Sequence, residues 1–146
     1  MRIYLDNCCL QRPLDNQTHP RIRVETEAVF AVLAAVQAKE LVLLDSEALH
    51  YEISCIPDDT RRTEALALLS LASEHLQITD TIEALALTFE QRGLSAMDAI
   101  HLALASTAKA DYFCTCDDKL FRKAIAIPGL TCKVITLLSL IPEVTK

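Results

Sequence analysis

The sequence predicts an α/β fold: one domain, residues 1–146, in which helices cover both faces of a central parallel sheet. Short apolar runs alternate with longer amphipathic segments along the chain, as strands and helices do in such sheets. A length of 146 residues suits one domain with a sizeable core. No repeat, linker or low-complexity segment divides the chain.

Five short apolar runs are the expected strands, because each is bounded by polar or turn residues and is too short for a helix. They are residues 1–5, 41–44, 75–78, 111–114 and 132–136. Helices are expected between them, where capping residues precede apolar residues at helical spacing. The helices start near Arg21, at Asp45-Ser46, near Thr60 (to Ser73), at Asp80 (to Gly93), at Ser95 and after Thr115. Residues 11–20 are typical of a polar loop, and residues 137–142 of a short apolar tail.

Two helix starts in the C-terminal half each have a carboxylate nearby. Ser95 is a good N-cap and Asp98 stands three residues on, which is the capping-box spacing. Thr115 and Asp118 repeat this spacing after a short strand. That accounts for Asp118 as part of a cap but leaves Asp117 unexplained. Because α/β sheets bind ligands at the carboxyl ends of their strands, Asp117 is a candidate functional residue.

Carboxylates from distant parts of the chain are expected to meet at one edge of the sheet. Right-handed crossovers bring the carboxyl ends of all parallel strands to the same edge. Asp6 and Asp117 both follow predicted strands, Asp98 lies one turn into a helix that starts there, and Glu52 lies nearly two turns into another. Crowded carboxylates repel one another, and a divalent cation relieves that repulsion.

Composition excludes several function classes. The two glycines, Gly93 and Gly129, are too few and too far apart for a P-loop or a Gly-rich dinucleotide loop. A net charge of -6 disfavours general nucleic-acid binding, unless the acids gather in one metal pocket with bases around it. No apolar run is long enough to span a membrane. Six cysteines, no CxxC pair and no signal peptide favour a reduced cytoplasmic protein whose cysteines are mostly core residues.

Four segments together resemble the PIN-domain ribonucleases, the group that includes the VapC-like toxins of bacterial toxin–antitoxin pairs. They are Ile3-Tyr4-Leu5-Asp6-Asn7, Ser46 to Glu52, Leu94-Ser95-Ala96-Met97-Asp98-Ala99-Ile100-His101, and Ala110 to Asp117. The resemblance covers nearly the whole chain and implies a PIN-like three-layer α/β/α sandwich. It also implies a metal-dependent endoribonuclease in which Asp6, Glu52, Asp98 and Asp117 hold Mg²⁺ or Mn²⁺.

The resemblance also assigns supporting residues and partners. Thr115 matches a small hydroxyl residue that often accompanies the fourth acid. Family members often have a small residue and then Asn or Ser after the first acid, whereas Asn7 here follows Asp6 directly. The implied substrate is RNA and the implied partner is a cognate antitoxin. The apolar excess favours a homodimer or an antitoxin groove, with the helix from Thr60 to Ser73 as the best candidate for such a face.

The acids suit hydrolysis of a phosphodiester. Hard divalent cations take oxygen ligands, activate water for attack on phosphorus and stabilise the leaving oxygen. The residues leave open whether one metal or two would act. Four basic residues near the acidic edge are candidate RNA contacts, with a solvated surface as the alternative: Arg12, Lys119, Arg122 and Lys123.

Each acid also has a simpler explanation. Asp98 could be only a capping partner, Asp6 a polar strand end, and Asp117 a first-turn acid that faces the helix dipole. Glu52 could be a solvated helix residue, and its rivals for the site are Glu47 and Asp45. His101 is expected to be a hydrogen-bonded core histidine rather than a ligand.

Two other functions remain as alternatives. A phosphoacceptor signalling domain also has acids at strand ends, but it would want a Lys after the last strand, where this chain has Thr136. A catalytically degenerate PIN-like module would bind RNA or protein without cutting. A test of metal dependence separates the degenerate module from a nuclease.

Overall fold

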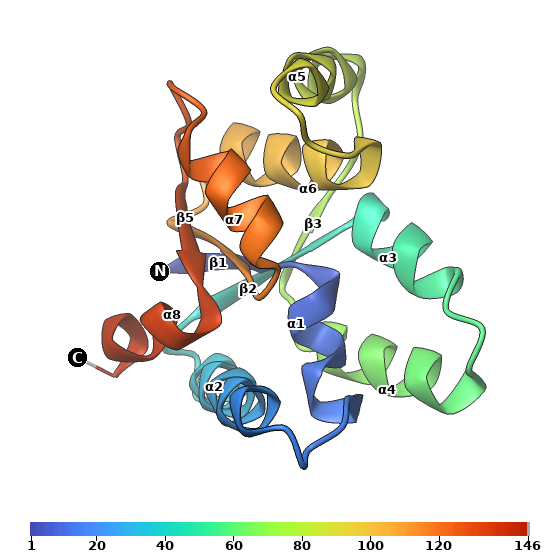
Figure 1. Ribbon diagram of the computed structural model, residues 1–146, viewed down its shortest axis with the longest axis vertical. Coiled ribbons are helices and arrows are strands. Elements are labelled where there is room, and N and C mark those ends of the chain that lie inside the picture. Colours follow the sequence, from blue (N-terminus) through green and yellow to red (C-terminus); the bar gives the residue numbers. More distant parts are fainter. Residues whose placement is uncertain (146) are drawn as a thin grey trace.

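The computed structural model describes residues 1–145 and contains a five-stranded sheet in which every neighbouring pair is parallel. The strand order is β3-β2-β1-β4-β5. The strands are β1 (Arg2–Leu5), β2 (Val42–Ser46), β3 (Glu74–Leu76), β4 (Tyr112–Thr115) and β5 (Lys133–Thr136). Figure 1 shows helices on both sides of this sheet, which confirms the three-layer α/β/α prediction.

The helices form the two outer layers. They are α1 (Asn7–Gln11), the 3-10 helix η1 (Arg12–Leu14), α2 (Pro20–Gln37), α3 (Glu47–Ser54), α4 (Asp59–Leu69), α5 (Asp80–Gln91), α6 (Ala96–Thr107), α7 (Asp118–Ile125) and α8 (Leu137–Val144). Helix α5 packs on α6 on one side of the sheet, and α2 packs on α8 on the other (Figure 1). No helix within residues 1–145 is both long enough and apolar enough to cross a bilayer.

Strand β1 is the centre of the sheet, and its residues explain why. Ile3 and Tyr4 are 0% exposed and Leu5 is 1% exposed. A strand flanked by strands on both edges and helices on both faces must be apolar on both faces, as these residues are. Because β1 lies in the middle, the residue that follows it, Asp6, is placed at the centre of the carboxyl edge.

Several element boundaries differ from the sequence prediction. The helix expected from Thr60 to Ser73 is α4, which ends at Leu69, and the strand that follows is shorter than expected. The segment at 11–20 is only partly a loop, because it contains the end of α1 and all of η1. The apolar tail forms α8 with Pro142 inside it. Leu137 and Leu140 are fully buried there, so packing outweighs the backbone hydrogen bond that proline cannot make.

Candidate metal centre

Asp6 ends β1 and lies buried at the carboxyl edge of the sheet. Its side chain is the N-cap of α1, where Oδ1 accepts from the Asn7 amide at 2.8 Å. Oδ2 accepts from Thr115 Oγ1 at 3.0 Å and from Cys8 Sγ at 3.4 Å. Burial raises the pKa of Asp6 well above its usual value, and the nearby Cys8, Asp98 and Glu52 raise it further.

Thr115 was expected both to begin a cap with Asp118 and to accompany the fourth acid, Asp117. Its hydroxyl accepts from the Asp117 amide at 3.1 Å and also donates to the first acid, Asp6. The side chain that caps α7 is Asp117, whose Oδ1 accepts from the amides of the second and third residues of that helix. The capping prediction for Thr115 and Asp118 was therefore wrong.

Asp118 lies in the first turn of α7 and pairs with a residue that the sequence did not single out for it. Its two oxygens accept from the Arg21 guanidinium at 2.7 and 2.8 Å. Helical spacing alone would favour a weak pair with Arg122, four residues on. Arg21 comes from the start of α2, so this contact is set by tertiary packing and not by helical spacing.

Glu52 is held by a buried chain of hydrogen bonds. Its Oε1 lies 3.0 Å from His101 Nε2, and His101 Nδ1 lies 2.6 Å from the Tyr4 hydroxyl. The Tyr4 hydroxyl lies 2.7 Å from Ser46 Oγ, which caps α3 by accepting from Leu49. Because a carboxylate only accepts, His101 Nε2 donates to Glu52. This chain sets the position of Glu52 at the edge.

His101 is fully buried and hydrogen-bonded, as the sequence predicted. Burial lowers its pKa, but the hydrogen bond to Glu52 and the charges of Asp6, Glu52 and Asp98 outweigh this, so the pKa of His101 is raised. Oxygen atoms of Asp6 and Glu52 and a ring nitrogen of His101 lie within 4.8 Å of one another. The histidine is thus in contact with the acidic group, which sequence reasoning did not foresee.

Asp98 and Asp117 line a cavity of about 300 Å³ on the same edge. Asp98 is half-buried in the first turn of α6, and its amide donates to Ser95 Oγ, the N-cap, at 3.2 Å. Burial raises the pKa of Asp98, the hydrogen bond with Ser95 lowers it, and the charges of Asp117 and Glu52 raise it again, so the net pKa is raised. The four predicted acids are therefore close enough to interact electrostatically.

The two rivals of Glu52 are engaged elsewhere. Asp45 is buried, and its Oδ2 is bound by His50 at 2.6 Å and His75 at 2.8 Å. Glu47 Oε1 accepts from the Ile78 amide at 2.8 Å. Of the three candidates, the geometry brings Glu52 to the acidic group.

Asn7 is buried beside Asp6, and its Oδ1 has no hydrogen-bond partner among the described residues. A buried amide oxygen without a partner costs free energy, which a bound cation or its water would relieve. The donor set at this edge is therefore four carboxylates and a free amide oxygen. Such hard oxygen ligands suit Mg²⁺ or Mn²⁺.

The four basic residues predicted to contact RNA differ in whether their charged groups are already paired with acids of the protein. Lys119 and Lys123 line the acidic cavity, and Lys123 Nζ donates to the Gly93 carbonyl at 2.7 Å. Arg122 is exposed on the same helix, α7. Arg12, by contrast, is paired with Asp15 at 2.9 Å and Glu25 at 3.0 Å, and its side chain is 19% exposed.

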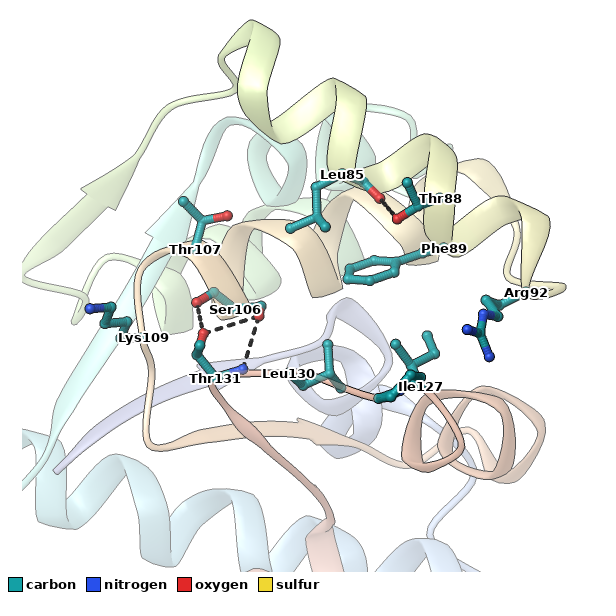
Figure 2. Close-up of a pocket in the computed structure, with 12 residues that line it drawn as sticks. Leu85, Thr88, Phe89, Arg92, Ser106, Thr107, Lys109, Ile127, Leu130 and Thr131 are labelled. Carbon is teal, nitrogen blue, oxygen red and sulfur yellow. Dashed lines mark hydrogen bonds between the residues drawn. The ribbon is translucent and has the colours of Figure 1, made fainter.

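A second cavity, of about 410 Å³, lies between α5, the end of α6 and the loop before β5 (Figure 2). It shares no residue with the acidic cavity. Thr131 Oγ1 donates to the Ser106 carbonyl, and the Thr131 amide donates to Ser106 Oγ at 3.2 Å. These polar groups satisfy one another, so we assign no reaction to this cavity.

This chain resembles known proteins in its structure but not detectably in its sequence. No family model matches the sequence, and no curated protein matches it. Two solved structures are similar over nearly the whole chain. VapBC2 from Rickettsia felis, in a crystal structure bound to a DNA fragment from its promoter, has 18% identity and a TM-score of 0.59, covering 92% of this chain and 98% of that one. The fold is PIN-like. PAE2754 from Pyrobaculum aerophilum has 15% identity and a TM-score of 0.60, covering 99% of this chain and 90% of that one.

Proposed function

We propose that this protein is an Mg²⁺- or Mn²⁺-dependent endoribonuclease that hydrolyses RNA phosphodiester bonds at the acidic edge. The observation that carries the proposal is the convergence of Asp6, Glu52, Asp98 and Asp117. Among the described residues, no Lys or Arg forms a salt bridge with any of these four. Glu52 contacts His101 at 3.0 Å. Carboxylates gathered with no Lys or Arg partner repel one another and destabilise the fold, and functional sites are where such destabilisation is found.

The acids, with Asn7, would hold the cation, which supplies an activated water and charge for the leaving oxygen when bound. The residues of the chain contribute fixed positions. Asp6 is held by the Asn7 amide and Thr115, Asp117 by its helix cap, and Glu52 by His101. Preorganised ligands of this kind place the scissile phosphate without reorganisation during the reaction.

Basic side chains on α7 would guide the RNA backbone to this edge. Lys119 and Lys123 line the cavity that also holds Asp98 and Asp117, and Arg122 is exposed nearby. Lys and Arg contacts to phosphate fix the position of a nucleic acid without reading its sequence. Arg12 is not part of this set, because its guanidinium is taken by Asp15 and Glu25.

We further propose that the nuclease is the toxin of a toxin–antitoxin pair and acts in the cytoplasm. The VapBC2 structure supports this through its fold and through the promoter DNA named with it. A cognate antitoxin and a homodimer partner would need apolar surface. Leu66 on α4, the helix predicted from sequence as a partner face, is 39% exposed, and Phe30 on α2 is 52% exposed.

The test is RNA cleavage by the purified protein and by Asp98→Asn. A mixed pool of structured and single-stranded RNA is incubated with Mg²⁺, with Mn²⁺ or with a chelator. We expect cleavage that requires the metal and is lost in the variant. Asp80→Asn is the matched control, because Asp80 is an exposed acid in the first turn of another helix, α5. Its cleavage should equal that of the wild type.

Metal binding is read separately, by calorimetric titration with Mg²⁺ and Mn²⁺. Cleavage that survives chelation, or that is unchanged in Asp98→Asn, contradicts the proposal. Absence of both cleavage and metal binding would also overturn it. That result would instead support a catalytically degenerate PIN-like module that binds RNA or protein.

A further inference from the structure

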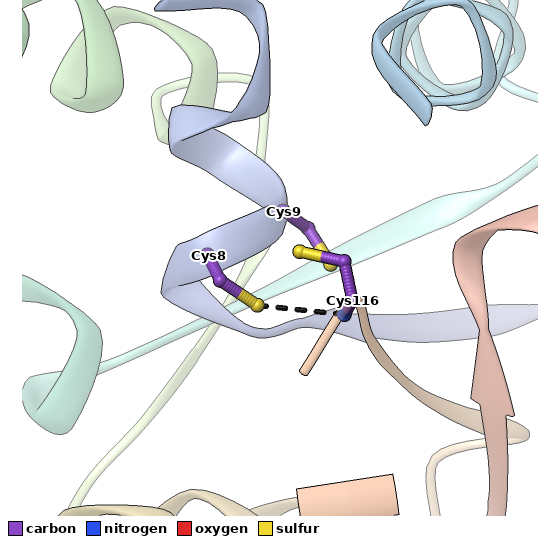
Figure 3. A group of neighbouring side chains, drawn as sticks. All are labelled: Cys8, Cys9 and Cys116. Carbon is purple, nitrogen blue, oxygen red and sulfur yellow. Dashed lines mark hydrogen bonds between the residues drawn. The ribbon is translucent and has the colours of Figure 1, made fainter. Parts of the chain in front are cut away.

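Three cysteines gather at the carboxyl ends of β1 and β4, next to the acidic group. Cys8 and Cys9 lie in the first turn of α1, and Cys116 follows β4. One Sγ atom from each lies within 4.8 Å of the other two. Figure 3 shows the three thiols pointing toward a common centre.

The fold brings these thiols together from opposite ends of the chain. Strands β1 and β4 pair in parallel, with Leu5 opposite Cys114, so the residues just beyond them lie side by side. Cys9 and Cys116 are buried, while Cys8 is only partly buried. The cluster is therefore shielded on most sides and has access from solvent at Cys8.

The separation of the sulfur atoms suits a metal ion. A thiolate–zinc bond of about 2.3 Å in a tetrahedral site places sulfur atoms about 3.8 Å apart. Because the three sulfur atoms lie within 4.8 Å of one another, side-chain movements of about 1 Å would bring all three within bonding distance of a shared metal ion. Soft sulfur ligands favour thiophilic d10 cations, whereas the carboxylates beside them favour hard cations.

The surroundings of the cluster can support thiolates. The Cys116 amide donates to Cys8 Sγ at 3.4 Å, and Thr115 Oγ1 lies 3.5 Å from the same sulfur. The guanidinium of Arg12 interacts electrostatically with Cys116. The amide donor and the nearby positive charge offset the negative charge that thiolates bring.

Loss of the thiol protons leaves no acceptor unsatisfied. Cys9 Sγ donates to the Cys114 carbonyl at 3.5 Å, but that carbonyl also accepts from the Asp6 amide at 2.9 Å. Cys8 Sγ donates to Asp6 Oδ2, which also accepts from Thr115 Oγ1. The protons can therefore leave to solvent as a metal binds, without creating a buried acceptor that lacks a donor.

We propose that Cys8, Cys9 and Cys116 form a binding site for a thiophilic d10 cation, Zn²⁺ or Cu⁺, separate from the hard-cation centre. Three sulfur ligands suit Cu⁺ directly. Zn²⁺ would take water as a fourth ligand, from the side where Cys8 is only partly buried. An iron–sulfur cluster is not proposed, because it needs four ligands of this type.

The first arm of the test uses Co²⁺ as the probe for the zinc form. Titrated into the reduced full-length protein, Co²⁺ should give a near-ultraviolet thiolate-to-cobalt charge-transfer band that saturates at one ion per chain. Added Zn²⁺ should remove the band, and excess Mg²⁺ should leave it unchanged. In the second arm, the protein is titrated with Cu⁺ in competition with a colorimetric Cu⁺ chelator. Retention of Cu⁺ without a cobalt band would assign the site to Cu⁺.

Cysteine variants locate the site. Cys8→Ser and Cys116→Ser should weaken metal affinity by more than the roughly tenfold to hundredfold loss that outer ligands typically cause. Cys55→Ser is the matched control, since it removes one exposed thiol outside the cluster and should bind like the wild type. Asp98→Asn should also keep the cobalt band, because the thiols and not the acids produce it.

Three results would overturn the proposal. The first is wild-type protein that binds neither probe, and the second is binding by Cys8→Ser and Cys116→Ser that equals that of the wild type. Displacement of Co²⁺ by Mg²⁺ would also overturn it, because it would place the cobalt on the carboxylates. Circular dichroism checks that each variant is folded. If Cys116→Ser does not fold, Cys8→Ser decides the question, because Cys8 is only partly buried.

Discussion

The two edges of the sheet contrast in how their charges are compensated. At the amino edge, Arg2 binds Glu74 through two hydrogen bonds of 2.8 and 3.0 Å and donates to the Ala108 carbonyl at 2.6 Å. Its amide also donates to Asp111 at 2.7 Å. At the carboxyl edge, four acids gather, and a ring nitrogen of His101 lies within 4.8 Å of carboxylate oxygens of Asp6 and Glu52.

The charged groups at the amino ends of the strands are therefore paired with one another, whereas the four acids at the carboxyl ends have no Lys or Arg partner within residues 1–145. The amino edge is satisfied by its own residues and contributes to stability. The carboxyl edge keeps raised pKa values at Asp6 and Asp98 and a free amide oxygen at Asn7. A protein tolerates such a region where binding requires it, at some loss of stability. Four predictions test this difference.

The largest effect is expected at Asp6. Asp6→Asn should lower RNA cleavage by more than the roughly tenfold to hundredfold typical of outer-shell changes. It should also stabilise the metal-free protein at pH 7, because burial and the nearby charges raise the pKa of Asp6 well above its usual value and so disfavour its charged form. Cleavage assays and urea unfolding without metal measure the two effects.

The pH dependence of that stability has a definite sign. With a raised folded pKa, the Asp6 carboxyl favours folding below its usual pKa of 3.8, and this contribution is lost as pH rises through the raised value. Asp6→Asn removes this loss, so the stability difference between variant and wild type should grow with pH. Mg²⁺ should stabilise the wild type and not the variant. A variant less stable than metal-free wild type at pH 7 would contradict the comparison.

The next effect is expected at Tyr4, which connects Ser46 to His101. Tyr4→Phe removes the hydroxyl, leaving His101 Nδ1 without that partner. It should cost about 1 to 3 kcal/mol of stability. Through the weakened support of Glu52 it should lower kcat about tenfold, with KM little changed. Tyr112→Phe, which removes a hydroxyl at the other edge, serves as the control. An equal fall in kcat in both variants would rule out a positioning role for Tyr4.

At the amino edge, Arg2→Met should affect stability alone. The change removes the ion pair with Glu74 and the hydrogen bond to the carbonyl of Ala108, the C-cap residue of α6. We expect a loss of about 1 to 3 kcal/mol, or about 2 to 4 °C in Tm per kcal/mol for a chain of this size. Cleavage below the melting range should not change. Arg23→Met, at an exposed arginine of α2, should stay within about 0.5 kcal/mol of the wild type.

The smallest effect is expected from the pH dependence of the Arg2–Glu74 pair. The hydrogen bond from Arg2 lowers the pKa of Glu74 below its usual 4.5. This pair therefore contributes stability above that pH, and the contribution is lost as pH falls through the lowered value. Glu74 is 40% exposed, so solvent screening limits the contribution to under about 1 kcal/mol. Unfolding of Glu74→Gln at pH 7 and pH 3 measures it: a larger difference at pH 3 would show the sign to be wrong.

Much of the fold could be predicted from local pattern. Alternation of apolar runs with capped helices fixes a parallel sheet, and the positions of Asp6 and Asp117 after strands place them on one edge. The acid on the helix after the second strand was harder, because helical spacing alone did not separate Glu52 from Asp45 and Glu47. The structure separates them through contacts with His101, His50 and the Ile78 amide, which no spacing reveals.

The side-chain contacts across the sheet could not be predicted in the same way. The cysteines were expected to be mostly core residues, and four of the six are buried, but that expectation did not reveal that three of the cysteines share one centre. Only the pairing of β1 with β4 brings Cys8 and Cys116 together. Tyr4 lies two residues before Asp6, and this spacing places both side chains on the same face, so the sequence could indicate that Tyr4 is near the acids. Its hydrogen bond with His101, by contrast, depends on how α6 packs.

The double use of Asp6 and Asp117 has an evolutionary consequence. Each carboxylate uses Oδ1 to cap a helix, α1 or α7, and leaves Oδ2 for other contacts. Asparagine caps a helix as well as aspartate does, and one base change converts an Asp codon to an Asn codon. A single mutation can thus abolish the charge while the fold persists. Under the proposed function, a lineage could lose RNA cleavage and keep RNA binding without passing through an unfolded intermediate.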